Sequence, residues 1–286
     1  MDGANPAPIS EHVLAEIRLF IERRSGIFFD ESRTRFLSNR VAKHLKHRRL
    51  AHGTDLLRLI NASNAEYDAL LEMLLTQETS FFRYPAVYEA LEQRVLPELH
   101  GKKFWHNPRS LRIWSAGCST GEEPYSIAIS ILETLEFPEA WKLEILATDI
   151  SRHALDVAQR GQYSRRELSS FTAEQVDTYF GCTADGQYRV KARLRNMITF
   201  AQMNLAEMVY MGRFDCIFCM NVLIYFSEEL RATLIRRFYE CLEPDGYLFL
   251  GHAESVAKAK VDLEPIVISD SLIYRKSMRT ALQESL

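Results

Sequence analysis

Two glycines and two adjacent glutamates follow a short apolar run near the middle of the chain. The segment Gly117–Pro124 reads Gly-Cys-Ser-Thr-Gly-Glu-Glu-Pro and comes directly after Leu111–Ala116. Glycines let the backbone turn sharply and approach a ligand closely, and the spacing is neither the dinucleotide fingerprint nor a phosphate-binding P-loop. The two carboxylates would repel a phosphate and favour a ligand with cationic groups. The positive end of the following helix would also explain them.

Polar side chains follow three further apolar runs. Asp149 ends the run Leu143–Thr148, where an acidic residue can accept hydrogen bonds from ribose hydroxyls, although Asp also caps helices. Asn204 and Asn221 follow the next two runs, where their amides could bind an adenine edge or a carboxylate, or stabilise loops. With the glycine segment, these residues favour a cationic nucleoside such as S-adenosylmethionine (SAM).

The arrangement of apolar runs predicts how these residues come together. From residue 111 on, short apolar runs alternate with helical stretches. This pattern predicts an α/β fold with a doubly wound parallel sheet, whose ligands lie at the carboxyl ends of the strands. Residues 1–100 show helical periodicity only, and Pro97 should end a helix that Pro85 begins. We therefore expect a helical domain at 1–100 and an α/β domain at 101–286, with a small insertion at 162–195 around the turn Asp185-Gly186.

Composition narrows the class of protein. The net charge of −3 gives no case for nucleic acid as a partner. No apolar run approaches the roughly 18 residues of a membrane span, and the first residues lack the pattern of a signal peptide. Five scattered cysteines indicate reduced thiols in a cytoplasmic protein. The pair Cys216 and Cys219 lies within an apolar strand without a second pair, so we expect no bound metal.

Five motifs, in this order and over nearly the whole chain, resemble the chemotaxis receptor (protein-glutamate) O-methyltransferase family, CheR. They are Thr79–Arg83, Ser119–Ser126, Ala147–Ile150, Asn221–Phe226, and Pro244–Gly246 followed by Gly251-His252. The resemblance implies a Rossmann-like SAM-dependent methyltransferase with an all-α N-terminal domain and a small antiparallel β-subdomain. It also implies transfer of the SAM methyl group to glutamate carboxylates of membrane-bound chemoreceptors, with S-adenosylhomocysteine as the second product.

The resemblance also implies the site residues. SAM contacts would come from Gln77, Thr79, Arg83, Glu122, Asp149, Asn204, Leu205, Met220 and Asn221. Arg83 and Tyr225 would lie beside the transferable methyl group and orient the acceptor carboxylate. Gln77 and Met220 depart from the commoner family residues, Asn and Arg, so Met220 would contact SAM only through backbone or apolar atoms. Glu123 is an alternative to Glu122.

A basic run without any carboxylate spans residues 32–54 and suits an acidic receptor surface. Its cations are Arg33, Arg35, Arg40, Lys43, Lys46, Arg48 and Arg49. A solvated basic helix face is the alternative explanation. In some family members the β-subdomain binds a receptor C-terminal peptide, but here the loop at Ala184–Gln187 is short and poor in glycine, so we expect no dependence on such a tether.

Two other functions fit parts of the pattern. One is a SAM methyltransferase with a different acceptor, although Asn221–Tyr225 lacks both prolines of the Asn/Asp-Pro-Pro-Tyr box found in amino methyltransferases. The other is a non-catalytic SAM-sensing interaction module. The presence of both Arg83 and Tyr225 argues against a sensor, which needs neither residue.

Overall fold

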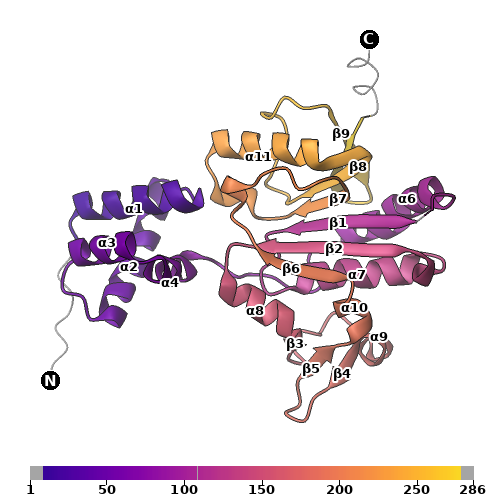
Figure 1. Cartoon of the computed structure of the whole chain (residues 1–286), viewed down its shortest axis with the longest axis horizontal. Coiled ribbons are helices and arrows are strands. Elements are labelled where there is room, and N and C mark those ends of the chain that lie inside the picture. Colours follow the sequence, from indigo (N-terminus) through magenta and orange to yellow (C-terminus); the bar gives the residue numbers. More distant parts are fainter. Residues whose placement is uncertain (1–8, 108, 278–286) are drawn as a thin grey trace. The chain divides into compact units, whose positions relative to one another are not determined.

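The computed structural model describes residues 9–107 and 109–277. Its contacts divide the chain into two compact units (Figure 1). Unit 1 holds the chain up to Thr76 together with Tyr225–Leu230, and unit 2 holds Gln77–Ile224 and the chain from Arg231 on. The domain division at residue 100 stays a prediction; by contacts, the helices between residues 85 and 103 group with the sheet.

Unit 1 is helical. Its elements are α1 (Glu11–Ser25), a 3-10 turn η1 (Glu31–Arg33), α2 (Thr34–Arg48), α3 (Gly53–Ala62) and α4 (Asn64–Leu74). Helix α1 begins where the Ser10 hydroxyl accepts a hydrogen bond from the Val13 amide, and it ends at Gly26, whose φ of 77° is the left-handed conformation that glycine favours. Apolar side chains at helical spacing, such as Ile17, Ile21 and Leu37, are fully buried and form the core.

Unit 2 contains a seven-stranded sheet in the order β6-β2-β1-β7-β8-β10-β9. The strands are β1 (Ser110–Ala116), β2 (Lys142–Asp149), β6 (Ile198–Gln202), β7 (Phe214–Cys219), β8 (Leu242–Leu250), β9 (Leu263–Ile268) and β10 (Ser271–Lys276). The first five in sheet order pair in parallel, and β10 is antiparallel to both its neighbours. The predicted doubly wound sheet is confirmed. Strand order reverses beside β1, so the β1 and β7 loops meet at the switch point.

Helices cover both faces of this sheet (Figure 1). The helices of unit 2 are α5 (Pro85–Ala90), α6 (Leu96–Lys103), α7 (Glu122–Thr134), α8 (Arg152–Arg160), α9 (Ala173–Tyr179), α10 (Ala192–Arg195) and α11 (Glu228–Cys241), with short turns η3 (Pro138–Ala140), η4 (Leu205–Glu207) and η5 (Leu223–Tyr225). Of these, α9 and α10 belong to the insertion at residues 162–195 rather than to the faces of the large sheet. The prediction that a helix ends before Pro97 is wrong. A π-helical turn, η2 (Leu91–Val95), joins α5 to α6, and Pro97 occupies the first turn of α6, where a missing N–H is tolerated.

The insertion forms a small antiparallel sheet in the order β3-β5-β4, from β3 (Gln162–Tyr163), β4 (Phe180–Cys182) and β5 (Tyr188–Val190). The predicted β-subdomain is thereby confirmed. Phe81 packs edge-to-face on Tyr163, Phe171 and Phe180, with ring centroids 4.8 to 5.8 Å apart. The residues just before α5 therefore pack directly against the insertion. In the part of the chain that the structure describes, no helix has the length and apolar character needed to cross a bilayer.

Candidate functional site

The loop after β1 is held in a conformation that requires its glycines. Gly117 and Gly121 have φ angles of 88° and 98°, and Ser119 between them has a φ of 47°. A side chain at Gly117 would overlap with Val222 in the loop after β7. The two loops at the switch point therefore approach each other closely, and the sharp turn that the glycines predicted is present.

Asp149, at the end of β2, holds this loop and the next one together. Its Oδ2 accepts a hydrogen bond from the Ser119 amide at 2.8 Å, and its Oδ1 accepts one from the Ser151 amide at 2.8 Å. The Ser151 hydroxyl in turn accepts a hydrogen bond from Gln77 Nε2 at 3.2 Å and caps α8. Three predicted site segments, around Gln77, Ser119 and Asp149, therefore meet at one point.

The two glutamates at the start of α7 point to different partners. Glu122 is buried, and its carboxylate accepts a hydrogen bond from the Thr120 hydroxyl at 2.7 Å. Glu123 accepts one from the Ser115 hydroxyl at 2.6 Å, beneath the loop. Burial raises the pKa of both carboxyls, that of Glu123 to about 7. For Glu123 the Ser115 bond and the Arg83 charge oppose the rise, and the nearby Glu254 carboxylate adds to it. Glu122 is thus bound to the loop that contains Ser119, through Thr120, and which of the two glutamates contacts SAM stays a prediction.

Asn204 and Leu205 follow β6 at the same edge. The Asn204 side chain accepts a hydrogen bond from the Ala206 amide at 3.1 Å and caps η4, in which Leu205 is buried. The preceding Met203 amide donates to the Asp149 carbonyl at 2.9 Å. These contacts bring the end of β6 to the end of β2, so the two predicted residues lie beside the Asp149 segment.

Arg83 lies on a strained stretch of backbone. Its neighbours Phe82 and Tyr84 have φ angles of 50° and 64°, which bulky residues rarely adopt and which cost on the order of 1 to 3 kcal/mol each. The Arg83 guanidinium donates to the Glu78 carbonyl at 2.6 Å and lies 5.1 Å from the Tyr84 ring. Such strain persists where the surrounding structure enforces it, and it is typical of functional sites. Thr79 lies partly buried on the same stretch.

Tyr225 belongs to unit 1. Its carbonyl accepts a hydrogen bond from the Phe28 amide at 2.8 Å, and the Arg33 guanidinium lies 5.2 Å from its ring. Its role next to Arg83 stays a prediction, as do the other ligand contacts.

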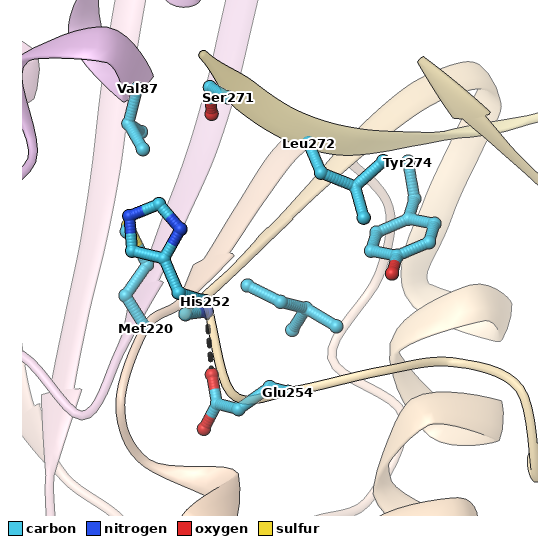
Figure 2. A pocket seen from close by; sticks show the side chains of 9 residues that line it. Val87, Met220, His252, Glu254, Ser271, Leu272 and Tyr274 are labelled. Atoms are coloured by element: carbon cyan, nitrogen blue, oxygen red, sulfur yellow. Dashed lines mark hydrogen bonds between the residues drawn. The ribbon is translucent and has the colours of Figure 1, made fainter. Parts of the chain in front are cut away.

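A cavity of about 60 Å³ adjoins the end of β7 (Figure 2). Its lining comes from Val87, Met220, Leu250, Gly251, His252, Glu254, Ser271, Leu272 and Tyr274. Met220 therefore lines this cavity with an apolar side chain, and its contact with SAM stays a prediction. The His252 ring packs edge-to-face on Tyr84 with centroids 4.9 Å apart. The pair Gly251-His252 was predicted from the sequence as part of a motif, but Glu254, three residues after Gly251, was missed.

The comparisons with known proteins agree with this geometry. A family described as CheR methyltransferase, SAM binding domain, matches residues 77–271. The chain belongs to the CheR methyltransferase family. It is therefore a SAM-dependent methyltransferase, and the predicted family and cofactor are confirmed.

Curated relatives match over most of their length. Chemotaxis protein methyltransferase 2 of Vibrio cholerae is 36% identical over 89% of this chain and 89% of its own. Chemotaxis protein methyltransferase 1 of Pseudomonas aeruginosa is 33% identical over 90% of this chain and 95% of its own. The chemotaxis protein methyltransferase of Escherichia coli is 35% identical over 86% and 85%, respectively.

The residues at the strand ends suit SAM. Ser119 Oγ and Asn221 Oδ1 are buried polar atoms without a hydrogen-bond partner among the described residues. They lie on the two loops that meet at the switch point, and buried polar atoms of this kind normally have a partner. SAM offers an ammonium group and ribose hydroxyls that can donate to such oxygens. The acidic side chains of Glu122 and Asp149 at the same edge suit its cationic charge.

Proposed function

We propose that this CheR-family methyltransferase esterifies glutamate side chains of chemoreceptors, in the cytoplasm, as part of sensory adaptation. The observation that supports this acceptor is Arg83, a cation held by the Glu78 carbonyl on a strained segment of the unit that binds SAM. An anionic acceptor needs such a cation for orientation, through a charge-assisted hydrogen bond. The names of the curated relatives place methyl transfer in chemotaxis.

The proposed chemistry asks for positioning rather than for a strong base. A glutamate carboxylate has an ordinary pKa of about 4.3 and is a nucleophile at neutral pH. SAM, when bound, supplies an activated methyl group on a sulfonium. Arg83 would hold one carboxylate oxygen so that the other points at the methyl carbon, a placement that lowers the barrier through orientation alone. Tyr225 would donate a second hydrogen bond or shape the path of the methyl group.

The acceptor is tested with tritiated SAM and membranes that contain chemoreceptors. We expect label on receptor protein that mild base releases as volatile methanol, because methyl esters hydrolyse in base and methylated amines do not. Base-stable label, or label on added RNA or DNA instead, would show a different acceptor. SAM binding without any transfer would indicate a sensing module.

We propose that the partner surface is the basic run, which lies on η1, on α2 and on Arg49 directly after α2. Lys43, Lys46 and Arg49 are exposed, as is Arg35, whereas Arg48 pairs with Glu66 at 2.8 Å. Arg33 and Arg40 lie over the Phe36 ring. The cations available to an acidic helical receptor are therefore a subset of the predicted run.

Reversing two of the exposed charges, Lys43→Glu with Lys46→Glu, should weaken receptor methylation in a salt-sensitive way, because exposed charge pairs are screened by salt. SAM affinity should stay the same. The matched control is Arg23→Glu with Arg58→Glu, in the same unit but outside α2. Equal receptor kinetics for the two double variants would exclude the basic run as the docking surface. Independence from a receptor C-terminal tail peptide stays a separate prediction.

A further inference from the structure

Glu254 is a buried carboxylate that binds the loop after β7. Only 8% of the residue is exposed. Its Oε2 accepts hydrogen bonds from the Gly251 amide at 2.6 Å and the Asn221 amide at 3.1 Å, and its Oε1 accepts one from the Ile224 amide at 3.2 Å. Figure 2 shows the carboxylate below His252 at the edge of the cavity. One side chain from the turn after β8 therefore holds both ends of the segment Asn221–Ile224.

The backbone that Glu254 holds is one that needs support. Asn221 has a φ of 62°, in the left-handed region that most residues avoid. A side chain at Gly251 would lie 2.9 Å from both the Asn221 nitrogen and Glu254 Oε2. The close approach of the two turns thus depends on Gly251, and the carboxylate fills the space between them. A carboxylate suits this place because it accepts from several amides at once and donates to none.

The contact with Glu254 fixes the backbone of Asn221, a predicted SAM-binding residue. With its own amide bound to Glu254, Asn221 keeps its side-chain Oδ1 buried and without a partner among the described residues. We propose that Glu254 is a positioning residue for SAM: by fixing the backbone at Asn221, it aims the Asn221 amide group at the cofactor. This rests on SAM binding at the strand ends and not on glutamate as the acceptor. Glu254 itself does not need to contact SAM, because backbone amides already occupy both its oxygens.

Calorimetric titration of SAM into four proteins tests this: the wild type, Glu254→Gln, Asn221→Gly and the double variant. Glutamine has the shape of glutamate, but its NH2 group would face an amide donor. Glycine removes the Asn221 side chain and keeps the left-handed backbone without strain. We expect Glu254→Gln to raise the Kd of SAM about tenfold, or about 1.4 kcal/mol. In the Asn221→Gly background the same change should alter Kd by less than about twofold.

A tenfold effect of equal size in both backgrounds would mean that Glu254 stabilises the fold generally, and no effect in the wild type would also overturn the proposal. Amide hydrogen exchange without SAM gives a second readout: Asn221 and Ile224 should exchange faster in Glu254→Gln. Should that variant not fold, Glu254→Asp keeps the charge on a shorter arm and should also weaken SAM binding. The matched control is Glu264→Gln, exposed on β9, which should leave Kd unchanged. Receptor labelling by the wild type tests the acceptor separately.

Discussion

Carboxylates at the two ends of the parallel strands, here called the amino edge and the carboxyl edge of the sheet, have different kinds of partner. At the amino ends of the strands, acidic side chains pair with cations. At the carboxyl ends, Glu122, Glu123 and Glu254 accept hydrogen bonds from hydroxyls and backbone amides. The difference indicates that one edge is built for stability and that the other keeps polar capacity for a ligand.

The amino edge is joined to α6 by ion pairs. Asp215 near the start of β7 is 2% exposed, pairs with Lys103 at 2.5 Å and accepts a hydrogen bond from the Arg112 amide at 2.9 Å. Asp245 near the start of β8 pairs with Lys102 at 3.1 Å and Arg275 at 2.9 Å. Charges satisfied within the protein in this way have no need of a ligand.

At the carboxyl edge, strain and unsatisfied atoms coincide. Phe82, Tyr84, Ser119 and Asn221 all have left-handed backbones there, and the partnerless oxygens of Ser119 and Asn221 lie on the same loops. Left-handed backbone by itself does not distinguish the two edges, because Asp245 at the amino edge has a φ of 61°. At Ser119 and Asn221 it occurs together with a partnerless buried oxygen on the same residue, and this combination points to a ligand. Substitutions at one edge at a time test this difference.

The largest effect on stability is expected at the amino edge, from Lys103→Met. This change leaves the buried Asp215 carboxylate without its cation, and removing one partner of a buried pair costs about 3 to 5 kcal/mol. Urea denaturation measures the loss of unfolding free energy. The matched change Lys142→Met removes a cation from an exposed pair with Glu144 and should cost less than about 1 kcal/mol. Similar losses of unfolding free energy for both variants would contradict a stabilising role for the buried ion pair at this edge.

Next in size is Arg83→Ala at the carboxyl edge. The methyl-transfer rate should fall by about a hundredfold, which is about 2.7 kcal/mol in the barrier, because the acceptor carboxylate loses its orienting cation. The Kd of SAM should change far less. Turnover assays with receptor and calorimetry with SAM alone separate the two. A turnover within about twofold of the wild type would exclude Arg83 as the orienting residue.

A smaller, pH-dependent effect is expected from Glu123→Gln. Because burial raises the pKa of Glu123 to about 7 in the folded protein, ionising it disfavours the folded state. The wild type should therefore lose stability, relative to the variant, as pH rises from about 4.5 to 7, and the gap should persist above pH 7. We expect glutamine to stabilise the protein by on the order of 1 to 3 kcal/mol at pH 8 and by little at pH 4.5.

Denaturation of both proteins at the two pH values gives the difference, which cancels the titration of groups that they share. The neighbouring Glu254 and Arg83 charges are present in both proteins. An advantage of the variant that is equal at pH 4.5 and pH 8 would mean that Glu123 does not titrate in this range. Glutamine can still accept the Ser115 hydrogen bond, so the comparison isolates the charge.

Sequence reasoning predicted the sheet and part of the site because those signals are local. Buried parallel strands appear as continuous apolar runs, and Asp149 and the glycine segment follow their strands directly. Glu254 was missed because its partner Asn221 is 33 residues away, and no local pattern indicates that two turns will meet. The positive φ angles at Phe82 and Tyr84 contradict residue preference, so only tertiary packing could show them.

The most direct test of the division between the edges is calorimetric titration of SAM into a matched pair, Asp149→Asn and Asp245→Asn. Both changes remove one carboxylate charge from unit 2, at opposite edges of the sheet. The Kd of SAM should rise at least about tenfold, or about 1.4 kcal/mol, for Asp149→Asn and stay within about twofold of the wild type for Asp245→Asn. Equal affinities for the two variants, or weaker binding by Asp245→Asn, would contradict a SAM site at the carboxyl ends of the strands.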